Sequence, residues 1–525
     1  MRADRYDIVI IGSGAGGGTL AQALADSGAR MLIVERGTFV PQEEENWSPA
    51  AVWRDLRYRT DERWLDEAGR EFQPYAHYCV GGNTKFWGSV LYRLRREDFQ
   101  AIEHADGVSP AWPIDYETLE PYYERAERLY QVHGGSGDDP TEPPRRAPFP
   151  YAPIPHSSAM EAIVGQLRQQ GLHPSPLPLG LIRPSEPGGC ELCDTCNSFP
   201  CRVHAKSDAD VLCVRPLAGK PGVTLWTDAF ARRLLTDAAG RRVEAVEVER
   251  AGRTHRVEAP LFVVSCGAVN SAALLLRSAN DAHPNGLANS SGLVGKRYMA
   301  HLATMMEAID PRQRNDTTFQ KTVAINDYYL RGPESNHPLG HIQSQGRTHG
   351  LMAKLHAPWW GRRIPLGLYD WWVARGFDWL VMSEDLPNVD NRVAIDGAGR
   401  IVLRYRRSND RPHRELVEEA KRILARLGLR FPVTHSLGTT NTTHQCGTIV
   451  FGTDPRASVL DPFCRAHDVP NLFVVDASFF PSSAAVNPGL TIVAQALRVA
   501  EHIAESEKFE VQSWKVSSKS EVPPL

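Results

Sequence analysis

The sequence has no excess of positive charge. Its 525 residues include 59 Lys and Arg against 62 Asp and Glu, which gives a net charge of -3. No basic surplus is therefore present to neutralise phosphates or to draw the protein onto an anionic membrane, and we expect no nucleic acid partner. The hydrophobic and charged fractions, 42% and 23%, are typical of a globular chain.

A long apolar run is also absent. The one long uncharged stretch, residues 477–497, is interrupted by Pro481, Asn487, Pro488 and Gln495. A spanning helix needs about 20 mostly apolar residues, so we expect no membrane span but a loop that leads into a buried helix. The N-terminal segment lacks the small-residue cleavage site of a signal peptide. We therefore expect a cytoplasmic protein.

The cysteines do not form an even set. There are nine, and without a secretory signal we expect reduced thiols, a metal site or a cofactor site rather than a disulfide framework. Cys190, Cys193, Cys196 and Cys201 have the spacing C-x2-C-x2-C-x4-C, with His204 close behind. This is one residue longer than the ferredoxin-type spacing. Three interpretations stay open: an iron-sulfur cluster, a structural zinc site, or metal-free thiols or a local disulfide.

Strand and helix patterns extend over most of the chain. We predict a strand, a helix and a second strand over residues 6–35, a β-meander over 225–259, a further buried strand and helix from 263, and a last helix over 488–505. Two proline-dense stretches, 139–155 and 174–187, are predicted to be surface excursions. A late strand that returns to the first sheet implies a discontinuous cofactor domain.

A glycine motif stands between the first strand and the first helix. Gly12, Gly14 and Gly17 form G-x-G-x-x-G, and Glu35 ends the next strand. These glycines let the backbone approach a pyrophosphate at the helix N-terminus, and the Glu35 carboxylate can accept hydrogen bonds from ribose hydroxyls. The arrangement predicts a dinucleotide-binding site.

Two further segments carry polar residues next to glycine or proline. Residues 81–88, GGNTKFWG, form a second glycine turn, which by itself is better explained as an ordinary loop. Near the C-terminus a buried strand ends at Asp476, and Asn487 precedes Pro488 at a helix start. Asn487 is explained as a helix N-cap, and the positive end of that helix also suits a cofactor's developing negative charge.

Together these segments resemble the glucose-methanol-choline (GMC) family of flavin oxidoreductases. The resemblance rests on GSGAGGG with Glu35, GGNTKFWG, VVSCGAVNSAALLLRS at 263–278, HQCGT at 444–448, and residues 471–503. It implies an α/β fold in which a Rossmann-like FAD-binding domain packs on a substrate domain with a mostly antiparallel sheet. The expected boundaries are 1–100, 205–300 and 440–505 for the FAD-binding domain, 101–204 for a cap or insertion with the cysteine cluster, 301–439 for the substrate domain, and 506–525 for a flexible tail.

The resemblance also implies the site residues. FAD is the expected cofactor, His444 the catalytic base and Asn487 its partner. The implied cofactor contacts are Gly12, Gly14, Gly17, Glu35, Gly82, Asn83, Trp87, Ala231, Asp476, Pro488 and Thr491. Some sugar oxidases of the family tether their flavin through a His just before the Trp of the second glycine turn. Here that position is Phe86, so we expect non-covalent FAD.

The chemistry of alcohol oxidation explains why a His and an Asn suit this site. Hydride transfer from an alcohol leaves a positive carbonyl unless the hydroxyl proton is removed, and an imidazole in reach of that hydroxyl raises the rate by about 10²–10⁴-fold. We expect His444 to supply it, with a pH dependence near the imidazole value of about 6.5. The Asn487 amide can hold the same oxygen without competing for the proton.

Amides and tryptophans cluster between residues 320 and 379. Gln343 and Gln345 share one face of a predicted strand, and we expect both, with Gln320, to contact the substrate; Asn326 belongs to the same set. A solvent-exposed strand face explains these amides equally well. Five of the 12 Trp lie close together, and we favour core or interface anchors over sugar-stacking platforms; they are Trp359, Trp360, Trp371, Trp372 and Trp379.

The resemblance implies FAD-dependent oxidation of an alcohol, most closely that of the bacterial branch that oxidises secondary hydroxyls of sugars and glycosides. An external electron acceptor is then required, either oxygen, a quinone or a cytochrome, and a small subunit is an expected further partner. Some sugar dehydrogenases of the family carry a cysteine-bound cluster before an Ala-Lys pair, here Ala205-Lys206. Two alternatives stay open: a lyase on the same scaffold, and a catalytic subunit that works only within an electron-transfer assembly.

Overall fold

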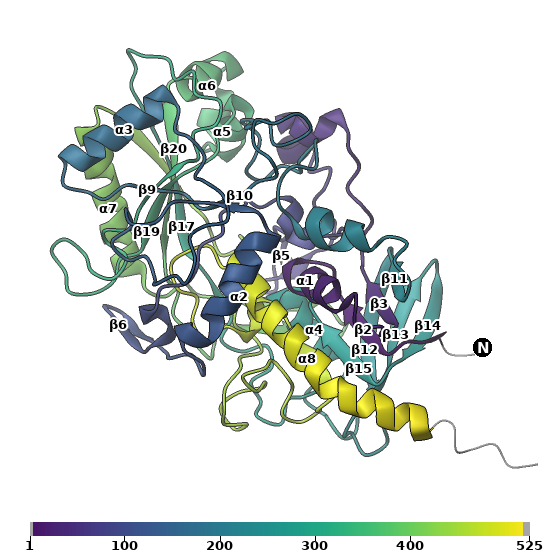
Figure 1. The fold of residues 1–525 in the computed structure, drawn as a ribbon. Coiled ribbons are helices and arrows are strands. Elements are labelled where there is room, and N and C mark those ends of the chain that lie inside the picture. The colour runs from purple at the N-terminus through teal and green to yellow at the C-terminus, as the bar shows by residue number, and fades with distance from the viewer. Residues whose placement is uncertain (1–3, 518–525) are drawn as a thin grey trace, which may run out of the picture.

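Five buried strands form a parallel sheet near the N-terminus (Figure 1). The structure, a computed structural model, describes residues 4–517. The sheet has the order β11-β3-β2-β15-β25, with β2 at Ile8–Ile11, β3 at Met31–Val34, β11 at Val223–Trp226, β15 at Leu261–Val264 and β25 at Leu472–Val474. Four of these strands are apolar runs buried along their whole length, as expected of a parallel sheet covered on both faces. Helix α1 (Ala15–Leu24) packs against α8 (Gly489–Ser517) beside this sheet.

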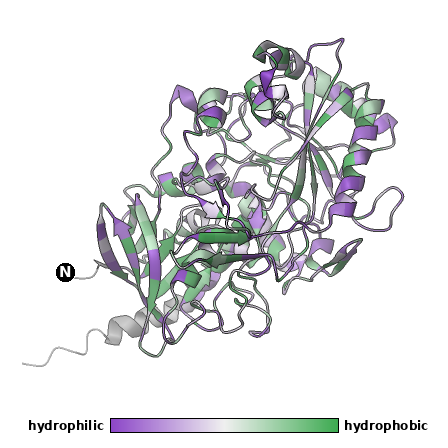
Figure 2. Cartoon of the chain, turned by 180° about the vertical axis from the view of Figure 1, so that it is seen from behind, coloured by the Kyte–Doolittle hydropathy of each residue, from purple (hydrophilic) through white to green (hydrophobic). Residues whose placement is uncertain are grey.

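The predicted β-meander is confirmed. Strands β12 (Ala229–Thr236), β13 (Val243–Arg250) and β14 (Arg253–Glu258) pair antiparallel, and β1 (Asp4–Arg5) joins the edge. Figure 2 shows hydrophilic and hydrophobic residues alternating along these strands, which is the pattern of a sheet with one buried face. Helix α4 (Ala268–Arg277) follows β15 and packs on β12.

A second large sheet has six strands, all paired antiparallel, in the order β23-β17-β20-β19-β18-β9. The strands are β9 (Ser175–Pro176), β17 (Leu302–Ile309), β18 (Val323–Ile325), β19 (His341–Ser344), β20 (Gly376–Ser383) and β23 (Arg430–Ser436). Helices α3 (Ser158–Gln169) and α7 (Asp410–Arg426) cover one face (Figure 1). Met306 and Trp379 pack there against Leu416 and Ile423 of α7. The opposite face is left to line a cavity.

Shorter elements connect the two sheets. They are helices α2 (Tyr116–Leu129), α5 (Gly350–His356) and α6 (Leu366–Val373), and strands β4 (Trp64–Leu65), β5 (Glu71–Phe72), β6 (Ile102–His104), β7 (Gly107–Ser109), β8 (Val132–His133), β10 (Leu179–Gly180), β16 (Met299–Ala300), β21 (Arg392–Ile395), β22 (Ile401–Arg404) and β24 (Gln445–Cys446). Short 3-10 or π turns complete the described chain.

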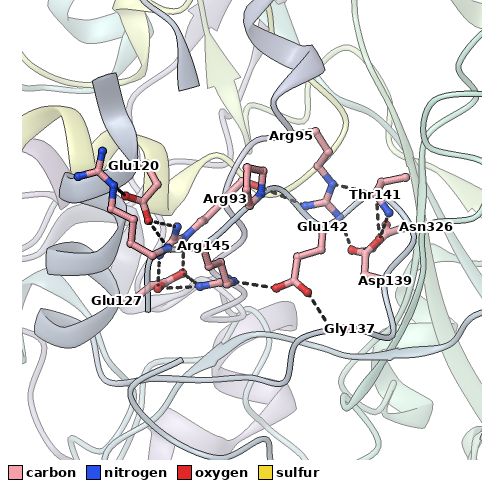
Figure 3. A network of polar contacts seen from close by, with 12 residues as sticks. Arg93, Arg95, Glu120, Glu127, Gly137, Asp139, Thr141, Glu142, Arg145 and Asn326 are labelled. Carbon is pink, nitrogen blue, oxygen red and sulfur yellow. Dashed lines mark hydrogen bonds and ion pairs between the residues drawn. The ribbon is translucent and has the colours of Figure 1, made fainter. Parts of the chain in front are cut away.

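Buried ion pairs fasten helix α2 to the first proline-dense stretch (Figure 3). Arg93 donates to both carboxylate oxygens of Glu127 at 2.8 Å, and Arg145 donates to the same carboxylate at 2.9 Å. A second group links Arg95 to Asp139 at 2.6 Å, and Asp139 to Asn326 beside β18 at 2.7 Å. Arg93 and Glu127 are each 1% exposed, so their charges depend on one another for compensation.

Two local predictions differ from the structure. Residues 174–181 are almost wholly buried and contribute β9 and β10, so this first part of the proline-dense stretch 174–187 is not a surface excursion. Residues 182–187 are exposed or half-buried, as predicted. Helix α8 continues past the predicted end at residue 505 as far as Ser517; residues 518–525 of the predicted tail lie outside the described part. No helix within residues 4–517 is long and apolar enough to cross a membrane. The domain boundaries stay a prediction.

Candidate active site

A cavity of about 1250 Å³ is lined by residues of both large sheets and of the loops between them. Small-molecule sites usually have about 300–1,000 Å³. This cavity therefore has room for a dinucleotide and a substrate together.

The two glycine turns meet at the end of the cavity formed by the parallel sheet. Gly12 has φ +102, and a Cβ there would lie 2.1 Å from the carbonyl oxygen of Ser265, so no other residue fits. Gly14 and Gly82 face each other, since a Cβ on Gly82 would lie 3.5 Å from the Cα of Gly14. Both line the cavity. Because these two glycines have no side chains, a pyrophosphate can approach the backbone closely between them.

Glu35 lies at the end of β3 and lines the same part of the cavity. Its Oε2 accepts hydrogen bonds from the Ser13 backbone N–H at 3.1 Å and hydroxyl at 2.6 Å, and its Oε1 accepts from the Gly37 N–H at 3.0 Å. Burial raises the pKa of the carboxyl group, and these donors oppose the rise. The carboxylate is thus held in place and keeps acceptor capacity for ribose hydroxyls.

Asp476 ties the ends of neighbouring parallel strands together. Its Oδ2 accepts from the Gly267 N–H at 3.0 Å and from the Ser271 hydroxyl, and its Oδ1 accepts from the Ser478 N–H at 2.8 Å. The residue is buried and lines the cavity. Its position at the carboxyl end of β25 is where open parallel sheets bind ligands.

Two histidines meet where the cavity reaches the six-stranded sheet. The Nδ1 atoms of His301 and His444 are 3.0 Å apart, and Nε2 of His301 lies 2.9 Å from the carbonyl oxygen of Ser483. A carbonyl oxygen only accepts, so Nε2 of His301 carries the proton and its Nδ1 is the acceptor. His444 must then donate from Nδ1, which leaves its Nε2 unprotonated.

Burial keeps this pair neutral. It lowers the pKa of His444 to about 3, with the charge on His301 as a second cause, and it lowers the pKa of His301 as well. The expected titration near 6.5 is therefore displaced to acid pH. His444 also has φ +53, a conformation that costs a non-glycine residue on the order of 1–3 kcal/mol and is concentrated at functional sites.

Asn487 lies beside the start of α8 and lines the cavity with His444. Its Oδ1 atom is buried and has no hydrogen-bond partner among the described residues. Unpaired buried polar atoms are rare in native proteins and call for a specific explanation. A ligand hydroxyl or cofactor at this position would supply the missing partner.

Comparison with known proteins identifies the fold. Family models of the GMC oxidoreductases match residues 6–303 and 387–496. The chain belongs to the GMC oxidoreductase family. Enzymes of this family act on CH–OH groups, and the predicted α/β fold class is confirmed.

Bacterial relatives extend over almost the whole chain. The 6'''-hydroxyparomomycin C oxidase of Streptomyces lividus is 33% identical, with 96% of this chain and 92% of that protein covered. The paromamine 6'-oxidase of Streptomyces fradiae is 31% identical (95% and 91%), and the fructose dehydrogenase large subunit of Gluconobacter japonicus is 27% identical (96% and 98%). Pyridoxine 4-oxidase from Mesorbium loti has a similar fold, with a TM-score of 0.64 at 20% identity over 94% of this chain and 98% of that one.

Most of the cofactor contacts predicted for this GMC oxidoreductase lie on the cavity. Those on its lining are Gly12, Gly14, Glu35, Gly82, Asn83, Trp87, Ala231, Asp476 and Pro488. Gly17 lies outside, because it packs α1 onto the turn: a Cβ there would lie 2.1 Å from the Gly12 carbonyl oxygen. Thr491 is also outside and is corrected, since its hydroxyl bonds the Tyr123 hydroxyl at 2.8 Å in the contact between α8 and α2. Phe86 lines the cavity and stacks on His77 with ring centroids 3.7 Å apart.

Some of the predicted substrate contacts line the cavity and others do not. Gln343 and Gln345 line the cavity from the end of β19. Gln320 does not and is corrected: it is buried and donates to Asp378 at 2.8 Å. Asn326 also lies behind the cavity wall, where it accepts from His341 at 2.6 Å.

The cysteine cluster finds no support as a metal site. Among the side chains that the structure describes, residues 4–506, no group of three or more His, Cys, Asp or Glu is placed to hold a metal ion. The Cys196 thiol instead accepts from the buried Lys321 ammonium at 3.4 Å. Burial opposes its ionisation, but Lys321 and Lys206 outweigh that effect and lower its pKa. All four cysteines are free thiols in the structure.

The tryptophans fall into two groups. Trp379 is a core residue, as favoured by the sequence, at 1% exposure. Trp359, Trp360 and Trp371 are instead among the exposed large apolar residues. Together with Trp372 they lie on the α5–α6 segment, and all except Trp359 line the cavity. The core interpretation is therefore wrong for these exposed side chains, whereas their interpretation as interface anchors stays a prediction.

No motif in the sequence predicts His301, Glu307 or Asp378 as site residues. His301 stands alone in MAHLATM, without a motif. Glu307 and Asp378 lie in separate strands whose pairing sequence periodicity does not reveal. The sequence signal that could have predicted these two acids is an acidic residue inside an otherwise apolar strand.

Proposed function

We propose that the protein binds FAD without a covalent bond and oxidises a hydroxyl group of a sugar or amino sugar, with His444 as the general base. The observation that carries the proposal is the His301–His444 pair. It holds His444 neutral and in the tautomer whose Nε2 can accept a proton. A base must be unprotonated and within reach of the proton that it takes.

The other residues of the cavity support this chemistry. FAD, when bound, supplies the hydride acceptor. His444 takes the hydroxyl proton, and the amide NH2 group of Asn487 donates to the substrate oxygen without competing for that proton. The N-terminus of α8, directly after Pro488, stabilises negative charge that develops nearby. Glu35, Gly14 and Gly82 hold the nucleotide part.

The relatives support a carbohydrate as substrate. Two of them are named as oxidases of paromamine and 6'''-hydroxyparomomycin C, and a third as a C-glycoside 3-oxidase. A relative named as a large subunit supports a small subunit as a further partner. The electron acceptor, the oxidised carbon and the cytoplasmic location stay predictions.

Anaerobic absorbance titration tests the proposal. Protein purified with its flavin is mixed with sugars, glycosides, amino sugars and simple alcohols. We expect flavin bleaching by at least one carbohydrate, and release of intact FAD on acid denaturation because Phe86 provides no nucleophile. A flavin that no alcohol bleaches would overturn the oxidation and favour the lyase. Oxygen consumption with the same substrate distinguishes an oxidase from a dehydrogenase.

A further inference from the structure

The cavity wall formed by the six-stranded sheet changes in character along its strands. Near His444 it is apolar, with Ala303, Leu380 and Met382 in one cluster with Met305 and Leu437. Further along β17 and β20 it carries two carboxylates, Glu307 and Asp378, which also line the cavity. The apolar part suits sugar C–H faces, whereas the acidic part needs a different ligand.

Glu307 and Asp378 lie directly opposite each other in the antiparallel pair of β17 and β20. Side chains in such positions have Cβ atoms about 4.5–5.5 Å apart, and like charges there repel. Burial and the charge of Asp378 raise the pKa of Glu307 well above its usual value, and burial raises the pKa of Asp378. The pair resists carrying two negative charges without a cation.

The two carboxylates differ in what holds them. Asp378 accepts from Gln320 at 2.8 Å, from the Thr348 backbone N–H at 3.1 Å and from the Thr348 hydroxyl. All these donors are neutral. The Oε1 atom of Glu307 is shielded from solvent and has no hydrogen-bond partner in the described chain. An unpaired buried carboxylate oxygen on a cavity wall is a place for a donor from a ligand.

The basic side chains near Glu307 and Asp378 do not donate a hydrogen bond to the unpaired Oε1 atom of Glu307. Arg347 lines the cavity, and its charge acts on both carboxylates to lower their pKa, against the stronger effect of burial. It makes no ion pair within 4.0 Å to any carboxylate of residues 4–506, so it is not in direct contact with the pair. His356 and His435 also line the cavity. Burial, and then the charge of His356, lower the pKa of His435, so it adds no positive charge at neutral pH.

We propose that Glu307 and Asp378 form a subsite for a protonated amine of the substrate. The inference rests on the proposed oxidation of a sugar hydroxyl and narrows the substrate to a cationic amino sugar. An ammonium group has three N–H donors and one positive charge. It supplies the hydrogen bond that Glu307 lacks and a positive charge in direct contact with the pair.

The position of the pair also sets the size of the substrate. Ala303 borders the apolar end near His444, and Glu307 follows four residues later on the same strand. At about 3.3 Å per residue this is a separation of roughly 13 Å. A substrate that contacts both Ala303 and Glu307 therefore extends beyond a single sugar ring, and we infer that its amine belongs to a ring beyond the one that is oxidised.

Glu307→Gln tests the subsite, because the amide keeps the shape of the side chain and removes its charge. Asp310→Asn is the matched control: it removes one charge just after the same strand, from a residue that does not line the cavity. Calorimetric titration of the full, flavin-loaded chain under anaerobic conditions measures the affinities for paromamine and for glucosamine. The N-acetylated form of each compound is the neutral counterpart.

We expect paromamine to bind the unchanged protein at least ~10-fold more tightly than its N-acetylated form, as one charge-assisted hydrogen bond provides. Glu307→Gln should abolish this preference, and Asp310→Asn should keep it. Equal affinities for amine and amide in the unchanged protein, no binding of either amine, or equal losses in both variants would overturn the subsite. Bleaching of the flavin by neutral sugars in that case would leave the proposed oxidation standing, whereas no bleaching by any alcohol would overturn the oxidation itself.

Discussion

His301 and His444 share a hydrogen bond between their Nδ1 atoms, 3.0 Å apart, and the second nitrogen of His301 is fixed by the Ser483 carbonyl oxygen. The Ser483 carbonyl oxygen thus fixes the tautomer of His301, and His301 in turn fixes that of His444. As a result Nε2 of His444 carries no proton. His301 does not line the cavity. It is a positioning residue, and it comes from a segment 143 residues before the base.

Replacement of the base gives the most direct test of the chemistry. In His444→Ala the residues that hold the cofactor are unchanged, so flavin content should be near normal. Flavin reduction by a substrate should slow by at least ~10²-fold, the lower end of what general base catalysis provides. Stopped-flow absorbance under anaerobic conditions measures this rate. Reduction at the rate of the unchanged protein would remove His444 from the mechanism.

His301 gives a separate prediction about the tautomer. His301→Gln keeps a carbonyl oxygen that can accept from Nδ1–H of His444, whereas His301→Leu leaves that donor unpaired. We expect the Leu variant to reduce its flavin on the order of 10-fold more slowly, the equivalent of one lost hydrogen bond. The Gln variant should recover most of the rate with an unchanged KM. Equal rates in the two variants would contradict the role of the acceptor.

The pH dependence follows from the lowered pKa of His444. A group with a pKa of about 3 is neutral over the whole working range and loses the ability to accept a proton only as the pH falls toward 3. The rate of flavin reduction should therefore be flat between pH 5 and pH 8. A pKa near 6.5 in the plot of this rate against pH would show that the site is more hydrated than the structure indicates.

The parallel sheet and the nucleotide half of the site could be predicted because their signals are local. Gly12, Gly14 and Glu35 stand within one strand-helix-strand unit, and the apolar runs of β2 and β3 are continuous. Asp476 and Asn487 are distant in sequence from this unit, but each follows a recognisable strand or precedes a helix. A sequence motif next to a predicted strand or helix is therefore enough to predict these residues.

The substrate half could not be predicted in the same way. The Glu307–Asp378 pair exists only through the register of β17 on β20, which no periodicity in either strand encodes. Gln320 has the residue type of a substrate contact but is used to hold Asp378. Thr491 follows Pro488 closely enough in sequence to be predicted as a cofactor contact. In the structure its position on α8 directs its side chain toward α2 instead. The spacing of four cysteines resembled a metal motif, but spacing alone does not determine how their thiols are arranged.

The buried network of Figure 3 provides a test of stability apart from chemistry. Glu127→Gln removes the carboxylate that accepts two hydrogen bonds from the buried Arg93 guanidinium and leaves it Glu120 alone. Removal of one member of a buried pair costs about 3–5 kcal/mol. Glu124→Gln on the same helix is the matched control, since its partner Arg128 is exposed and such pairs contribute about 0.2–1 kcal/mol. Urea unfolding followed by circular dichroism should give a lower midpoint for Glu127→Gln and a nearly unchanged one for Glu124→Gln. Both variants should reduce their flavin at the normal rate below the transition, because the network does not line the cavity. Equal midpoints for the two variants would mean that Arg93 is compensated by Glu120 alone.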